Sequence, residues 1–170
     1  GTGIYLAPEN RFLHRLINRV RARYGARFIA AGPNSLREAY RELRAGGGPF
    51  IIYIDALMHD RVQAPAFGRT LNPASNIYYA VQLAERSDAA LIPAYCERLD
   101  DAARFRVTFL PQLSMSSAAN KSMRVRENAA ALNAVIEPIV GARLDQWYFS
   151  LDYEDEPSSP RRDGKAERAR

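Results

Sequence analysis

The stretch GPFIIYIDALMHDRVQAPAFGR, residues 48–69, contains the strongest buried-strand signal of this chain. Its apolar run over 49–54 leads directly into Asp55. A strand that is apolar on both faces is typical of the centre of a parallel sheet. Ligands of such sheets bind beyond the carboxyl ends of the strands. Because Asp55 follows the predicted strand and begins a long loop, this end of the strand is the first candidate site.

Helical and strand patterns alternate on both sides of this stretch. Helical spacing of apolar residues predicts helices over 10–24, 35–45, 73–87 and 120–140. Short apolar runs predict further strands at 3–6, 27–31, 89–95 and 105–110. The alternation indicates an α/β fold with a mainly parallel central sheet flanked by helices. We expect the strands 27–31, 49–54, 89–95 and 105–110 to lie in one sheet, with Leu13, Leu16, Ile17 and Val20 as the buried face of the first helix.

Composition favours one domain over 1–150, because a chain of 170 residues with 47% hydrophobic residues can bury a sizeable core. Residues 151–170 begin acidic and end basic, and their Pro, Ser and charged residues predict a disordered tail. We find no apolar run long enough for a transmembrane helix. The single cysteine, Cys96, excludes an internal disulfide. The sequence shows no metal-ligand cluster and no phosphate-binding glycine loop, so we predict no metal and no cofactor.

Positive charge is concentrated near the start of the chain. The net charge is +5, which suggests an anionic partner. Residues 11–27 contain six arginines and no acid. Four of these arginines form one helical stripe: Arg11, Arg15, Arg19 and Arg23. The stripe is either a solvated face or a surface that contacts anionic headgroups. A nucleic-acid partner is not predicted, because aromatic residues such as Tyr24 are too few among these arginines for base stacking.

An ordered set of short motifs resembles the lysophospholipid acyltransferase superfamily. The set comprises Y-x-x-P-x-N (5–10), RVRARYG (19–25), LREAYRELRAGG (36–47), the strand ending in Asp55, APAFGR (64–69), DAALIPAY (88–95) and LDQWYF (144–149). Over residues 4–150 it is similar to the carboxyl-terminal part of the bacterial lipid A late acyltransferases, which transfer lauroyl and myristoyl groups. Two departures from the family pattern are Ala56, where a Gln is common, and the acidic stretch that follows Trp147.

The resemblance implies transfer of a fatty acyl group from acyl carrier protein or acyl-CoA to a hydroxyl of a lipid A precursor. It also implies a location at the cytoplasmic face of the bacterial inner membrane. The family's general base is the histidine of an H-x-x-x-x-D/E motif. At the matching distance, His14 is followed by Arg19 and His59 by Ala64, so neither histidine fits. We therefore expect this chain to lack the amino-terminal catalytic portion of the family, with a non-catalytic relative that binds anionic lipid as the alternative.

The same resemblance supplies the candidate site residues. Arg21 and Asp55 match a family arginine and a family acid, and we expect them to form an ion pair. Arg21 also falls at the edge of the predicted apolar face, where a charge needs either a partner or a route to solvent. Alternatively, Asp55 is a turn or helix-cap residue that follows the strand and has no role in a site. Phe67 and Gly68 resemble a family turn near the acyl-chain site, or they anchor a loop. Trp147 is expected to pack the carboxyl end of the domain.

Overall fold

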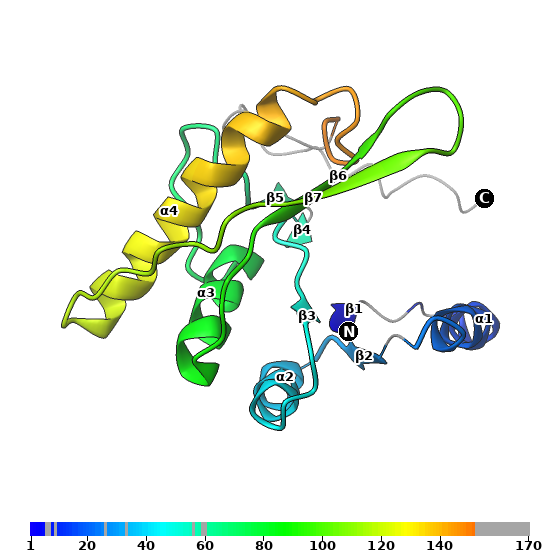
Figure 1. Cartoon of the computed structure of the whole chain (residues 1–170), viewed down its shortest axis with the longest axis horizontal. Helices are drawn as coiled ribbons and strands as arrows, with labels where there is room; N and C mark the ends of the chain where they lie inside the picture. Colours follow the sequence, from blue (N-terminus) through cyan, green and yellow to red (C-terminus); the bar gives the residue numbers. More distant parts are fainter. Residues whose placement is uncertain are drawn as a thin grey trace, which may run out of the picture.

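A computed structural model describes residues 1–5, 8, 10–25, 27–32, 34–55, 57–58 and 61–151, with the backbone alone at 57, 58 and 61. The chain begins with a small parallel sheet of strand order β2-β1-β3 (Figure 1). Its strands are β1 (Thr2–Tyr5), β2 (Arg27–Ala30) and β3 (Phe50–Ile51). The helices α1 (Arg11–Ala22) and α2 (Ser35–Arg44) connect them. The parallel β1–α1–β2–α2–β3 order confirms the predicted alternation of this region.

The strand predicted over 49–54 is much shorter than expected. Its pairing with β1 covers Phe50 and Ile51 and then stops. The carbonyl of Tyr53 instead accepts a hydrogen bond of 2.8 Å from the side chain of Asn76. Ile54 packs against the main hydrophobic core. The chain therefore leaves the sheet early and turns toward α3 (Asn76–Ser87), so that Asp55 follows a bend rather than a paired strand.

The described residues from 57 to 151 contain two helices and two antiparallel strand pairs. The longer pair joins β6 (Ala94–Arg98) to β7 (Phe105–Phe109), and the shorter joins β4 (Leu57–Met58) to β5 (Arg61–Val62). The expectation that 89–95 and 105–110 lie in one sheet with 27–31 and 49–54 is wrong, because β6 and β7 form a separate sheet. The short connection 99–104 makes β6 and β7 antiparallel neighbours, since parallel neighbours need a crossover of about a dozen residues or more, and the pair they form shares no hydrogen-bonded strand with β1, β2 or β3.

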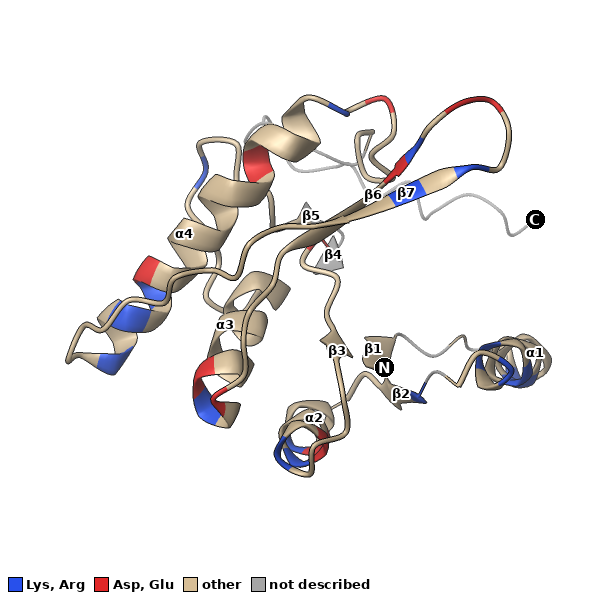
Figure 2. Cartoon of the chain, viewed as in Figure 1, with Lys and Arg blue, Asp and Glu red and all other residues tan. Residues whose placement is uncertain are grey.

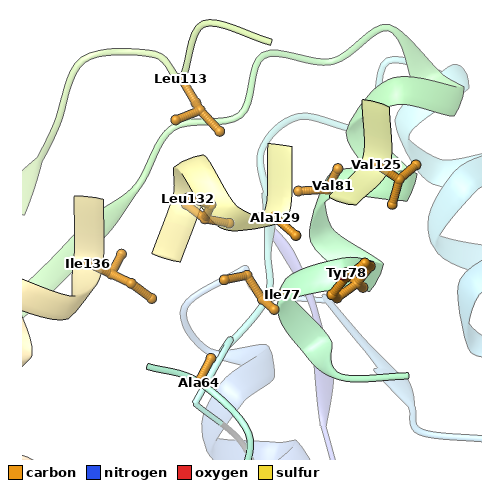
Figure 3. Close-up of a cluster of buried hydrophobic side chains, with 9 residues drawn as sticks. All are labelled: Ala64, Ile77, Tyr78, Val81, Leu113, Val125, Ala129, Leu132 and Ile136. Atoms are coloured by element: carbon orange, nitrogen blue, oxygen red, sulfur yellow. The ribbon is translucent and has the colours of Figure 1, made fainter. Parts of the chain in front are cut away.

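The main core lies where α3 meets α4 (Lys121–Gly141), with side chains from two connecting segments closing it (Figure 3). Ile77 and Val81 of α3 and Ala129 of α4 are fully buried. A second, smaller cluster, Ile29, Ala39 and Leu83, joins β2 and α2 to α3. Each large apolar side chain removed from water in this way stabilises the fold by about 1.5–3 kcal/mol. These two clusters hold both halves of the described chain together through α3.

The first helix departs from its expected packing. The predicted buried face of α1 is wrong, because no residue of this helix is buried. Phe12 is 82% exposed and Leu16 59% exposed, and Leu13 and Val20 are also exposed. Figure 1 shows α1 apart from the other helices, on the far side of β1 and β2. The sequence correctly predicts an amphipathic helix here, but in the part of the chain that the structure describes, the apolar side chains of α1 face solvent.

Candidate functional site

Asp55 bonds to a residue that lies far away in the sequence. The indole Nε1 of Trp147 donates a hydrogen bond of 3.0 Å to Asp55 Oδ2. Trp147 is buried and Asp55 half-buried, so this charge-assisted bond is shielded from bulk water. The carboxylate therefore holds the carboxyl end of the domain against the segment that follows β3.

The turn at Phe67 and Gly68 is held by α4 and closes on the same tryptophan. The amide of Phe67 donates to Glu137 at 2.8 Å, and the amide of Ala66 donates to Asn133 at 2.8 Å. Both Phe67 and Gly68 have positive φ, 46° and 84°, which is unusual for phenylalanine and ordinary for glycine. The Phe67 ring contacts Trp147 edge-on, with centroids 5.9 Å apart. Asp55 and Phe67 therefore both contact Trp147.

A cavity of about 320 Å³ opens beside Asp55 and Trp147. It lies between the segment 52–55, the base of the β6–β7 pair and α4. Its apolar lining consists mainly of Ile52, Ile54, Pro65, Pro93, Leu110, Ile136, Ile139 and Val140. Asp55, Arg143 and Gln146 add polar groups at its wall. An apolar cavity with a few polar groups is the usual form of a small-molecule or acyl-chain site.

Arg143 is a wall residue that sequence reasoning missed. Its guanidinium donates to Glu97 at 2.9 Å and lies over the ring of Tyr95, 4.9 Å from the centroid. The hydrogen bond that Arg143 donates to Glu97 raises the pKa of Arg143 above its ordinary value. The arginine thus ties α4 to β6 beside the cavity. Its sequence signal, one basic residue after the last helix, is too common to have marked it.

Arg21 lies elsewhere, and its expected ion pair with Asp55 does not form. Its guanidinium lies between two rings, 4.2 Å from the centroid of Phe28 and 4.9 Å from that of Tyr5. Among the described residues, the buried Nη1 of Arg21 has no hydrogen-bond partner. The physical reason for the error is that α1 packs through aromatic contacts on β1 and β2, whereas Asp55 is engaged by Trp147.

The predicted arginine stripe is exposed along α1. Figure 2 shows basic residues along this helix, and none of its residues is acidic. Arg11, Arg15, Arg19 and Arg23 are all exposed. His59 and Asp60 lie outside the described residues. Over 1–5, 8, 10–25, 27–32, 34–55, 57–58 and 61–151, no group of three His, Cys, Asp or Glu side chains is placed to hold a metal ion.

None of the helices in the described ranges combines the length and apolar character that crossing a bilayer requires.

Comparison with known proteins identifies the family. Residues 1–151 match the family model described as bacterial lipid A biosynthesis acyltransferase. A comparison with curated proteins gave no match. The family match spans every element of the fold and includes Arg21, Asp55, Phe67 and Gly68. This chain belongs to the bacterial lipid A biosynthesis acyltransferase family.

Proposed function

We propose that this chain contributes the substrate-binding part of a fatty acyl transfer reaction. The donor is acyl carrier protein or acyl-CoA, and the acceptor is a hydroxyl of a lipid A precursor or a related lipid. The single observation that carries the proposal is the family match over residues 1–151. The cavity beside Asp55 supports it, because an apolar lining of this extent suits an alkyl chain.

Asp55, Phe67 and Gly68 support the cavity rather than react with substrate. Asp55 holds Trp147, and the turn at 67–68 presses the Phe67 ring against the same indole. Both contacts fix the wall of the cavity near its polar groups. In this proposal Arg21 acts at a different place, as a group that binds a phosphate of the donor or acceptor.

The first helix provides the contact with the membrane surface. Arg11, Arg15, Arg19 and Arg23 contact anionic headgroups, and the exposed apolar side chains of α1 enter the interface. Arginines near an anionic surface contribute about 1 kcal/mol each. In this proposal the chain lies peripherally at the cytoplasmic face of the bacterial inner membrane, as the family resemblance implies. The exposed basic and apolar side chains of α1 also favour the second candidate, a non-catalytic relative that binds anionic lipid and transfers no acyl group.

In the proposed reaction, neither histidine of this sequence acts as the general base. Neither His14 nor His59 has an acid at the fifth following position. His14 is already engaged by Tyr5, with its Nε2 2.6 Å from the tyrosine Oη. A positioned base contributes about 10²–10⁴ in rate, so we expect little turnover from the 170-residue chain by itself.

Titration with dodecanoyl-CoA tests the proposal, with the fluorescence of Trp147 as the signal, since it is the sole tryptophan. The wild-type chain should bind, and Val140→Phe, which narrows the cavity, should weaken binding. Val107→Phe is the matched control, because Val107 is exposed and outside the cavity. Binding to anionic vesicles without any binding of the acyl donor would replace the first candidate with the second. Robust acyl transfer by the chain alone would contradict the assignment of the base.

A further inference from the structure

Four side chains form a compact cluster at one end of the parallel sheet: Tyr5, His14, Arg21 and Phe28. Tyr5 is the last residue of β1, the central strand, and Phe28 lies on the neighbouring β2. Their rings meet edge-on, with centroids 5.9 Å apart and an interplanar angle of 83°. The Arg21 guanidinium contacts both rings. The cluster therefore lies at the carboxyl end of a parallel strand, where sheets of this class bind ligands.

The aromatic contacts leave the hydrogen-bonding edge of Arg21 unused. Ring faces attract the cation, but they do not accept its five N–H donors in ordinary hydrogen bonds. Nη1 is buried, and no acceptor among the described residues lies within hydrogen-bond distance. No described carboxylate forms an ion pair with Arg21, whereas five other arginines of the chain do form such pairs. The geometry suits an arginine that receives a phosphate-type oxygen from outside the fold.

His14 fixes one of the two rings. Its Nε2 and the Oη of Tyr5 are 2.6 Å apart, and the two rings lie 5.9 Å apart. His14 and Arg21 are two helical turns apart and so share one face of α1. These two side chains contact Tyr5 of β1 and Phe28 of β2 and so tie α1 to the sheet. Loss of the His14 bond would free the Tyr5 ring and hence one wall around the guanidinium.

We propose that His14 is a positioning residue for Arg21. Acting through the Tyr5 hydroxyl, it holds the phenol ring that keeps the Arg21 N–H edge directed at a phosphate oxygen of a bound ligand. This inference rests on the proposed function of Arg21 as the phosphate contact. It adds His14, which neither the family motifs nor the charge pattern singles out, and it gives a role to Tyr5 of the Y-x-x-P-x-N motif. The phosphate belongs either to a lipid headgroup or to a soluble phosphorylated compound.

The first measurement needs no ligand. Side-chain ¹⁵N NMR follows the Arg21 Nε–H signal and the rotation of its guanidinium in the full chain. His14→Ala and Tyr5→Phe should each speed this rotation, and the double variant should match the single variants because both remove the same bond. His14→Gln should restore slow rotation, since its amide can still bond the hydroxyl. Asn18→Ala, an exposed change on the same helix, is the matched control.

The second measurement is binding, with inorganic phosphate in one arm and phosphatidylcholine vesicles containing phosphatidic acid in the other. His14→Ala and Tyr5→Phe should weaken binding about two- to tenfold in at least one arm, the equivalent of one hydrogen bond. The arm that weakens identifies the source of the phosphate. Unchanged rotation, or unchanged binding in both arms, would overturn the role of His14. If Arg21→Gln also binds like the wild type, the phosphate role of Arg21 fails; if only Arg21→Gln weakens binding, that role survives without His14.

Discussion

The bond between Asp55 and Trp147 makes a quantitative prediction about stability. Asp55→Ala removes the carboxylate that accepts a 3.0 Å hydrogen bond from the indole N–H of the buried Trp147. Hydrogen bonds to charged groups contribute about 1.5–3 kcal/mol. We therefore expect the free energy of unfolding to fall by about 1.5–3 kcal/mol. Asp55→Asn should cost less, because its amide oxygen can accept the same bond without the charge.

The assay is urea unfolding followed by circular dichroism, with thermal melting as a second readout. A chain of this size loses about 2–4 °C in Tm per kcal/mol, so Asp55→Ala should lower the Tm by about 3–12 °C. Asp145→Ala is the matched control, since this carboxylate is exposed on the same segment and should change stability by less than about 0.5 kcal/mol. A loss no larger than that of the control would refute the reasoning.

Two double-mutant cycles distinguish the observed pair of Asp55 with Trp147 from the ion pair of Asp55 with Arg21 that the sequence suggested. Asp55→Ala and Trp147→Phe should be coupled by about 0.5–3 kcal/mol, because they remove the two ends of one bond. Asp55→Ala and Arg21→Ala should add to within about 0.5 kcal/mol, because the two side chains share no described partner. Coupling of Asp55 to Arg21 with no coupling to Trp147 would restore the ion pair that the sequence suggested.

Three further outcomes follow from the packing and from the cavity wall. Ile77→Ala, in the fully buried core, should destabilise the chain by about 2–5 kcal/mol in urea unfolding, whereas Phe12→Ala on exposed α1 should change it by less than about 0.5 kcal/mol. Arg143→Ala should lower the urea midpoint of unfolding, because it removes the bond with Glu97; the same assay measures this loss, and equal loss in Arg143→Lys would implicate the planar guanidinium rather than the charge. Glu137→Ala should raise hydrogen exchange at the amide of Phe67, measured by NMR, because that amide donates to the carboxylate; unchanged protection would contradict this anchoring role.

Much of the local structure could be predicted because its signals are local. Apolar spacing predicted the four helices of the described residues to within a few residues at each end. The parallel order of β1 and β2 followed from the helix between them. The amphipathic character of α1 was also readable, but periodicity cannot say whether an apolar face meets protein or solvent.

The sequence by itself determined the helices, the parallel start of the sheet, the basic stripe and the family. Only the tertiary structure decided the partners of the site residues. Trp147 lies 92 positions after Asp55, and no local pattern links an indole N–H to a carboxylate over that distance. Arg21 likewise contacts two rings from different strands rather than the nearest expected acid. Such pairings depend on which surfaces bury the most apolar area together, and that is a property of the whole packed chain rather than of any segment.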